Sequence, residues 1–126
     1  DAWQRDFDDS LWDIVSIPHG VELLPEEASG NINYQGEAWY RKTFSVPENL
    51  KNKIVYLHFE GIMGKSRIWL NGKLLREHYN GYLPVIVDVT EGLNFETANT
   101  LAICADNSDD PSFLPGKPLY LFWRNL

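Results

Sequence analysis

The fold is decided by the stretch Arg67-Ile68-Trp69-Leu70-Asn71-Gly72-Lys73-Leu74-Leu75-Arg76. Two short β-patterned segments flank its central Asn-Gly pair. A two-residue type I′ turn needs positive φ at both central positions, and Asn followed by Gly adopts that geometry with the least strain. The stretch therefore predicts a tight β-hairpin and, with it, an antiparallel sheet.

Further strands are predicted on both sides of this hairpin, where apolar and polar residues alternate with the period of two that a half-buried strand shows. They cover residues 37–46, 53–61, 83–89 and 100–106. In the first of them, Tyr40, Phe44 and Val46 share the face that we expect in the core. Arg41 and its neighbours at alternate positions share the opposite face.

The segments outside these strands are less regular. Residues 8–20 contain a short β-branched run, and we predict an edge strand there because Pro18 removes one donor from the ladder. Residues 22–36 are rich in Gly, Asn and Pro and predict a long loop. For the apolar stretch at residues 119–123, a final strand and a truncated junction are both open.

Many short strands with turn signals between them, and no crossover helices, predict an all-β protein, an antiparallel jelly-roll β-sandwich. The chain has 126 residues, a length typical of one domain. Since no linker or internal repeat divides the sequence, we expect residues 1–126 to form a single β-sandwich domain.

The acidic composition limits the partners. A formal net charge of −7 opposes binding to nucleic acid and anionic lipid, because such binding depends on Lys and Arg that neutralise phosphates. No apolar stretch reaches the roughly 18 residues of a membrane-spanning helix. We therefore expect no nucleic-acid or membrane partner. Cys104 is the only cysteine, so no internal disulfide can form.

Several motifs follow one another in an order and spacing that together are specific. They are Phe7-Asp8-Asp9-Ser10, Trp39-Tyr40-Arg41-Lys42-Thr43-Phe44, Leu57-His58-Phe59-Glu60-Gly61, Trp69-Leu70-Asn71-Gly72 and Asp106-Asn107-Ser108-Asp109. Through them, residues 7–118 resemble the amino-terminal sugar-binding domain of β-galactosidases and related enzymes of glycoside hydrolase family 2. The resemblance implies a galactose-binding-like jelly roll that packs beside an immunoglobulin-like domain and a catalytic barrel, and the barrel supplies both catalytic glutamates.

The resemblance also implies where the site residues lie. In such enzymes the segment matching residues 106–109 reaches the active-site rim and touches sugar hydroxyls or a bound cation. Asp109 is therefore the first candidate for sugar binding and Asn107 the second. A Ca²⁺ or Na⁺ ion in the parent enzyme would bind at Asp109, and the domain itself requires no cofactor. The alternative is that these Asx residues only form turns by bonding their own backbone.

Two features depart from the family pattern. Residues 119–126 match poorly the glycine-rich stretch and the arginine-bearing closing strand of the family, so a sheet without that strand is one of the two open alternatives. The chain is also too short to include a catalytic barrel. We expect an excerpt or truncation of a larger retaining glycosidase, which hydrolyses O-glycosyl bonds, without catalysis by this chain alone.

Other candidate chemistry has a simpler explanation. A retaining glycosidase needs two carboxylates about 5–5.5 Å apart. The acidic pairs Asp8-Asp9, Glu26-Glu27 and Asp109-Asp110 all lie in turn-like sequence, where acids are usually solvated or capping. The three histidines are far apart in sequence and do not suggest a zinc site. Trp39 and Trp69 could stack on a sugar, but they lie within strand patterns, where we expect packed side chains.

Three hypotheses therefore stand. The first is a non-catalytic carbohydrate-binding and support domain of a β-galactosidase-like glycoside hydrolase, acting on galactoside glycans in carbohydrate metabolism. The second is a free-standing carbohydrate-binding module. The third is a structural β-sandwich that forms homo-oligomer contacts and binds no ligand. The sequence does not decide whether the parent enzyme is a β-galactosidase, a β-glucuronidase or a β-mannosidase. A glycan-degrading role favours a periplasmic or secreted location.

Overall fold

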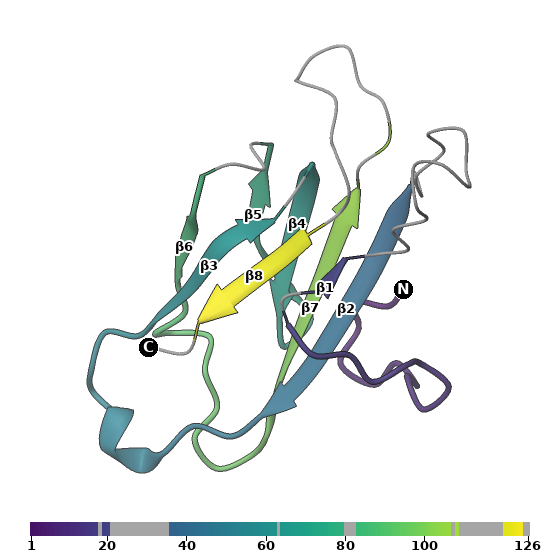
Figure 1. Cartoon of the computed structure of the whole chain (residues 1–126). Coiled ribbons are helices and arrows are strands. Elements are labelled where there is room, and N and C mark those ends of the chain that lie inside the picture. Colours follow the sequence, from purple (N-terminus) through teal and green to yellow (C-terminus); the bar gives the residue numbers. More distant parts are fainter. Residues whose placement is uncertain are drawn as a thin grey trace, which may run out of the picture.

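Two four-stranded antiparallel sheets face each other in the computed structural model of the chain (Figure 1). The structure describes residues 1–17, 19–20, 36–62, 64–79, 83–106, 108 and 120–124. For residues 19–20 and 120–124 it describes the backbone alone. Among these residues, no helix has the length and apolar character needed to cross a membrane.

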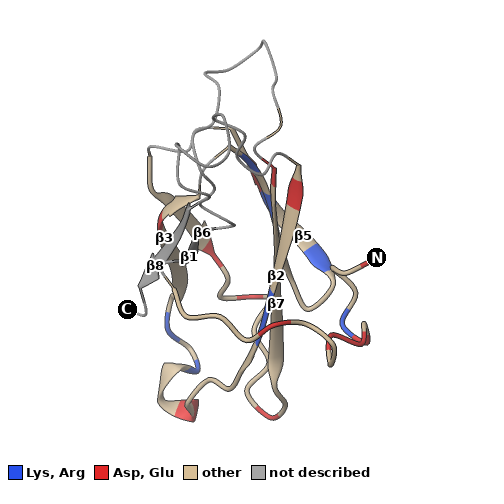
Figure 2. Cartoon of the chain, turned by 45° about the vertical axis from the view of Figure 1, so that its right-hand side comes forward, with Lys and Arg blue, Asp and Glu red and all other residues tan. Residues whose placement is uncertain are grey.

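The strands form two layers, which are seen side by side in Figure 2. Sheet A has the order β1-β8-β3-β6, with β1 at His19–Gly20, β8 at Tyr120–Arg124, β3 at Tyr56–Ile62 and β6 at Val85–Asp88. Sheet B has the order β2-β7-β4-β5, with β2 at Glu37–Phe44, β7 at Asn99–Asp106, β4 at Lys65–Leu70 and β5 at Lys73–His78. A short 3-10 helix, η1 (Glu48–Leu50), lies between β2 and β3. The predicted all-β sandwich is confirmed.

The predicted hairpin is the β4–β5 connection. Asn71 has φ 51° and Gly72 has φ 83°, the positive values that a type I′ turn requires at both positions. Beyond the turn, Leu70 pairs with Lys73 and Trp69 with Leu74. The local sequence therefore sets the register of this hairpin.

The core lies between the sheets and is made by the predicted alternation. Val85 and Val87 of β6 are 1% and 4% exposed, whereas Ile86 between them is 50% exposed. Tyr40 and Phe44 of β2 pack against the core from sheet B, as predicted. The buried cluster contains Phe59, Ile62, Ile68, Leu70, Val85, Val87, Val89, Leu93, Leu101, Ile103 and Ala105.

The prediction for the N-terminal end was wrong. Residues 8–17 form no strand, and the predicted edge strand is reduced to the two residues of β1, which does lie at the edge of sheet A. The start of the chain is held instead by Arg41 of β2, whose side chain bonds to Ala2, Gln4 and Asp9. At the other end a final strand, one of the two open alternatives, is confirmed, because β8 lies between β1 and β3.

Candidate functional site

The predicted site residues follow the end of β7, an inner strand of sheet B. Asp106, the last residue of β7, pairs with Glu37 of β2 on one side and with Lys65 of β4 on the other. Asn107 and Asp109 themselves lie outside the described residues, so their side-chain roles and the cation at Asp109 stay predictions. The sheet nevertheless fixes the point at which this segment begins, at the upper end of β7 in Figure 1.

We call this end of sheet B, formed by Glu37, Lys65, Asp106 and Ser108, the rim. The Oδ1 atom of Asp106 accepts a hydrogen bond of 2.8 Å from the backbone N–H of Ser108. This is an Asx turn, the structural alternative expected for an aspartate after a strand.

An aromatic and charged cluster covers the outer face of sheet B next to the rim. The indoles of Trp39 and Trp69 stack with centroids 5.1 Å apart and an interplanar angle of 24°. The guanidinium of Arg67 lies 5.5 Å from the Trp69 ring centroid and donates a hydrogen bond of 2.6 Å to Glu37. Both tryptophans are packed, as the strand pattern predicted, although the packing is on the outer face and not in the core.

Burial governs the proton affinities within and near this cluster. Desolvation raises the pKa of the Cys104 thiol, and the hydrogen bond from Arg67 opposes that rise without cancelling it. Desolvation also raises the pKa of the Tyr40 hydroxyl on the core side of β2. The thiol and the phenol are therefore neutral near pH 7, and neither has the lowered pKa of an activated nucleophile.

An N-terminal strap, residues 1–17, lies along the outside of β2 and is held by one arginine (Figure 1). The Nε atom of Arg41 donates to the Asp9 carboxylate at 2.9 Å. Its Nη1 atom donates to the carbonyl oxygens of Ala2 and Gln4, and its Nη2 atom to that of Phe7. These contacts use four of the five N–H donors of the guanidinium. The Arg41 side chain is 4% exposed.

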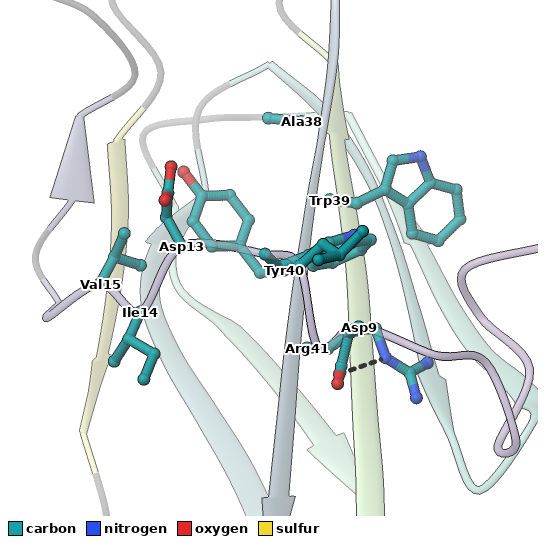
Figure 3. Close-up of a pocket in the computed structure, with 10 residues that line it drawn as sticks. Asp9, Asp13, Ile14, Val15, Ala38, Trp39, Tyr40 and Arg41 are labelled. Atoms are coloured by element: carbon teal, nitrogen blue, oxygen red, sulfur yellow. Dashed lines mark hydrogen bonds and ion pairs between the residues drawn. The ribbon is translucent and has the colours of Figure 1, made fainter.

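A cleft of about 530 Å³ lies between the strap and β2 (Figure 3). One wall is formed by strap residues 9–15 and the other by β2 residues 38–41. A second hollow of about 310 Å³ shares Val15, Tyr40 and Arg41 with the first and continues toward residue 17. This cleft could not be predicted from the sequence, because its two walls are about 30 residues apart along the chain.

No metal centre is evident among the described residues, where no three His, Cys, Asp or Glu side chains lie in a metal-binding group. His58 lies on β3 opposite Ile86, and His78 ends β5 opposite Ser66. The side chain of His19 is outside the described part of the chain. The described histidines thus occupy separate sheets.

The family is decided by the match of residues 23–111 to the model of the glycosyl hydrolase 2 galactose-binding domain-like family. The chain belongs to this family. The glycosyl hydrolase 2 galactose-binding-like domain is thus the region that includes β2, β7, the rim and the predicted residues Asn107 and Asp109. The strap, residues 1–17, precedes the matched residues.

Relatives and solved structures agree with this assignment of a galactose-binding-like domain. A β-galactosidase of Thermoanaerobacter pseudethanolicus is 37% identical over 91% of this chain, which spans 16% of that relative. A putative β-glucuronidase of Formosa agariphila is 32% identical over 89% of the chain, which spans 11% of it. The crystal structure of a Bacteroides uniformis β-glucuronidase superposes with a TM-score of 0.79 at 29% identity, covering 97% of this chain and 16% of that one. The chain thus corresponds to the non-catalytic galactose-binding-like domain of these glycosidases.

Proposed function

We propose that this galactose-binding-like domain serves a β-galactosidase-type glycoside hydrolase, in which it supports a catalytic barrel and supplies Asn107 and Asp109 to the rim of the substrate site. The parent reaction is hydrolysis of O-glycosyl bonds in carbohydrate metabolism, on galactoside-type glycans. An immunoglobulin-like domain and the barrel are the neighbouring partners. A Ca²⁺ or Na⁺ ion at Asp109 belongs to the same proposal, since hard cations prefer carboxylate oxygens.

The observation that carries this proposal is the position of Asp106 between Glu37 and Lys65. An inner strand is paired on both sides, so its last residue is a rigid point from which a short segment can be aimed. The Asx turn to Ser108 follows at once. In the sequence, Asn107 and Asp109 directly follow this anchored strand end, which supports a role in contact with a neighbouring domain's ligand.

A neutral galactoside is supported by the β-galactosidase relative at 37% identity. The rim itself is balanced in charge, because Lys65 pairs with Asp106 and the guanidinium of Arg67 bonds to Glu37.

A β-glucuronidase parent is the second candidate. It is favoured by the Formosa agariphila relative and by the superposition on the Bacteroides uniformis β-glucuronidase. These proteins share the sandwich, and the chemistry that separates their substrates is expected on the barrel. The present chain would support either barrel in the same way.

The support role is tested with a chimera in which this chain replaces the matching segment of the Thermoanaerobacter pseudethanolicus β-galactosidase. We expect the chimera to hydrolyse an aryl β-galactoside, and a variant with the segment deleted to be inactive. The control is a chimera carrying Ile68→Asp, which places an unpaired charge in the buried core and should abolish both folding and activity. A deletion variant as active as the chimera would contradict the proposal.

A further inference from the structure

The cleft beside β2 is a groove between the strap and the sheet. Its strap wall begins at Asp9, which Arg41 binds together with three strap carbonyls nearer the N-terminus. Its other wall is β2, which is paired with β7 along eight residues. The two hollows, of about 530 and 310 Å³, share lining residues and form one elongated groove. The larger hollow alone lies within the roughly 300–1,000 Å³ typical of small-molecule sites.

Two indoles lie at this groove, and both are held in place. Trp12 makes an edge contact with Phe7, with ring centroids 5.5 Å apart and an interplanar angle of 60°. Trp39 is stacked on Trp69 by one face of its indole. Rigid aromatic side chains bind with a small loss of conformational entropy, and an indole face packs well against the C–H face of a pyranose.

The larger hollow offers two carboxylate acceptors. Asp9 keeps 45% of its side-chain surface exposed although it pairs with Arg41, and Asp13 is exposed at the opposite side of the groove (Figure 3). Arg41 uses four of its five N–H donors on the strap, through its Nε, Nη1 and Nη2 atoms. The cationic side chain of Lys42 lines the smaller hollow. The larger hollow thus suits a ligand with many O–H donors and no negative charge.

We propose that this groove is a second carbohydrate site, which binds a neutral saccharide of one or two pyranose rings. Trp12 and Trp39 contact the apolar faces of the sugar, and the carboxylates of Asp9 and Asp13 accept hydrogen bonds from its hydroxyls. The strap wall distinguishes this site from the rim, although the two are neighbours, because Trp39 lies two residues from the rim residue Glu37 on β2. It would act as a glycan anchor whether or not the domain serves a catalytic barrel.

The test is an NMR titration of the 126-residue chain with galactose and lactose, which follows the indole N–H signals of its tryptophans. We expect saturable shifts of the Trp12 and Trp39 signals. Galacturonate, which differs from galactose by a carboxylate, should bind at least tenfold more weakly. Asp13→Ala should weaken lactose binding about tenfold, the size of one hydrogen bond to a charged group. Asp6→Ala removes the same charge from an exposed strap position outside the groove and should leave binding unchanged.

Trp12→Ala provides the second variant, and its fold is checked by retained signals of the Asn71-Gly72 hairpin. It should abolish the lactose shifts. The proposal is overturned if galactose and lactose cause no shifts at high millimolar concentration, if galacturonate binds as well as galactose, or if Asp6→Ala and Asp13→Ala behave alike. Self-association that Leu11→Ser abolishes would also overturn it, because Leu11 is 96% exposed and the groove would then be a protein contact.

Discussion

The Nε atom of Arg41 lies 2.9 Å from Oδ2 of Asp9, and this contact joins two segments that are 32 residues apart in sequence. The same guanidinium bonds three strap carbonyls and lies 5.4 Å from the ring centroid of Phe7. One side chain on the outer face of β2 thus orders the first turns of the strap. It also sets one wall of the groove.

Arg41→Ala should lower the free energy of unfolding by roughly 3 kcal/mol, because three strap carbonyls, two of them partly buried, and the Asp9 carboxylate lose their donor. Arg41→Lys keeps the positive charge but loses the planar guanidinium that donates to several oxygens at once, so we expect an intermediate decrease in the free energy of unfolding. Urea denaturation measures both, and amide exchange of residues 2–9 should increase. Arg5→Ala is the matched control, since Arg5 is exposed and makes only contacts of 3.3–3.4 Å; it should cost about 0.5 kcal/mol or less. Equal losses for Arg5→Ala and Arg41→Ala would refute the role of the clamp.

Asn71 joins the hairpin turn to two other segments. Its Nδ2 atom donates to the carbonyl of Gly92 and to Oδ1 of Asn99, and its Oδ1 atom accepts from the N–H of Thr100, each at 2.9 Å. Asn71→Ala should therefore cost roughly 3 kcal/mol, from these bonds and from its positive φ.

Asn52→Ala is the control for Asn71, since Asn52 also has positive φ, 67°, but is exposed. Asn52→Ala should lower the free energy of unfolding only through the strain of a positive φ at alanine, by about 1 kcal/mol. Thermal unfolding of the two variants separates the side-chain bonds from the strain. A loss at Asn71 no greater than that at Asn52 would show that the amide bonds contribute little.

The Asp88 carboxylate accepts hydrogen bonds from the Thr90 hydroxyl at 2.7 Å and from the Thr90 backbone N–H at 2.9 Å. These bonds lower its pKa below the ordinary value of 3.8, and the hydroxyl has the larger effect. Because the folded-state pKa is the lower one, the stabilisation is complete above the ordinary pKa and is lost as the pH falls through the folded-state pKa.

Thr90→Val should raise the pKa of Asp88 toward 3.8, and Thr90→Ser should leave it low. Carboxyl-carbon NMR titration measures both values. Asp8 is the internal control, because its pKa is lowered by Ser10 instead and should not respond. An unchanged Asp88 pKa in Thr90→Val would assign the shift to another cause.

The fold was predictable where its determinants are local. The Asn71-Gly72 turn needs only its own backbone preferences, and the alternation of Val85, Val87 and Val89 needs only a buried face. The strap was not predictable in this way. Its β-branched run before Pro18 favours a strand locally, whereas the contacts that place the start of the strap come from Arg41 on β2, which is distant in sequence.

The candidate site residues Asn107 and Asp109 are still predictions from the family resemblance. The structure adds the anchoring of Asp106 between two strands. The groove could not be found from spacing, since its walls meet only after folding. The sequence held one signal of the contact between the strap and β2. An arginine is expected on the outer face of β2, and the strap is rich in aspartates that could pair with it, among them Asp1, Asp6, Asp8 and Asp9.

The central claim, that Asp109 reaches the substrate rim, is tested most directly by the kinetics of Asp109→Asn in the β-galactosidase chimera. Asp110→Asn is the matched neighbour. We predict that Asp109→Asn lowers kcat/KM for an aryl β-galactoside at least tenfold, which corresponds to about 1.4 kcal/mol of transition-state stabilisation, while Asp110→Asn stays near the parent chimera. An Asp109→Asn chimera as active as its parent would contradict the account.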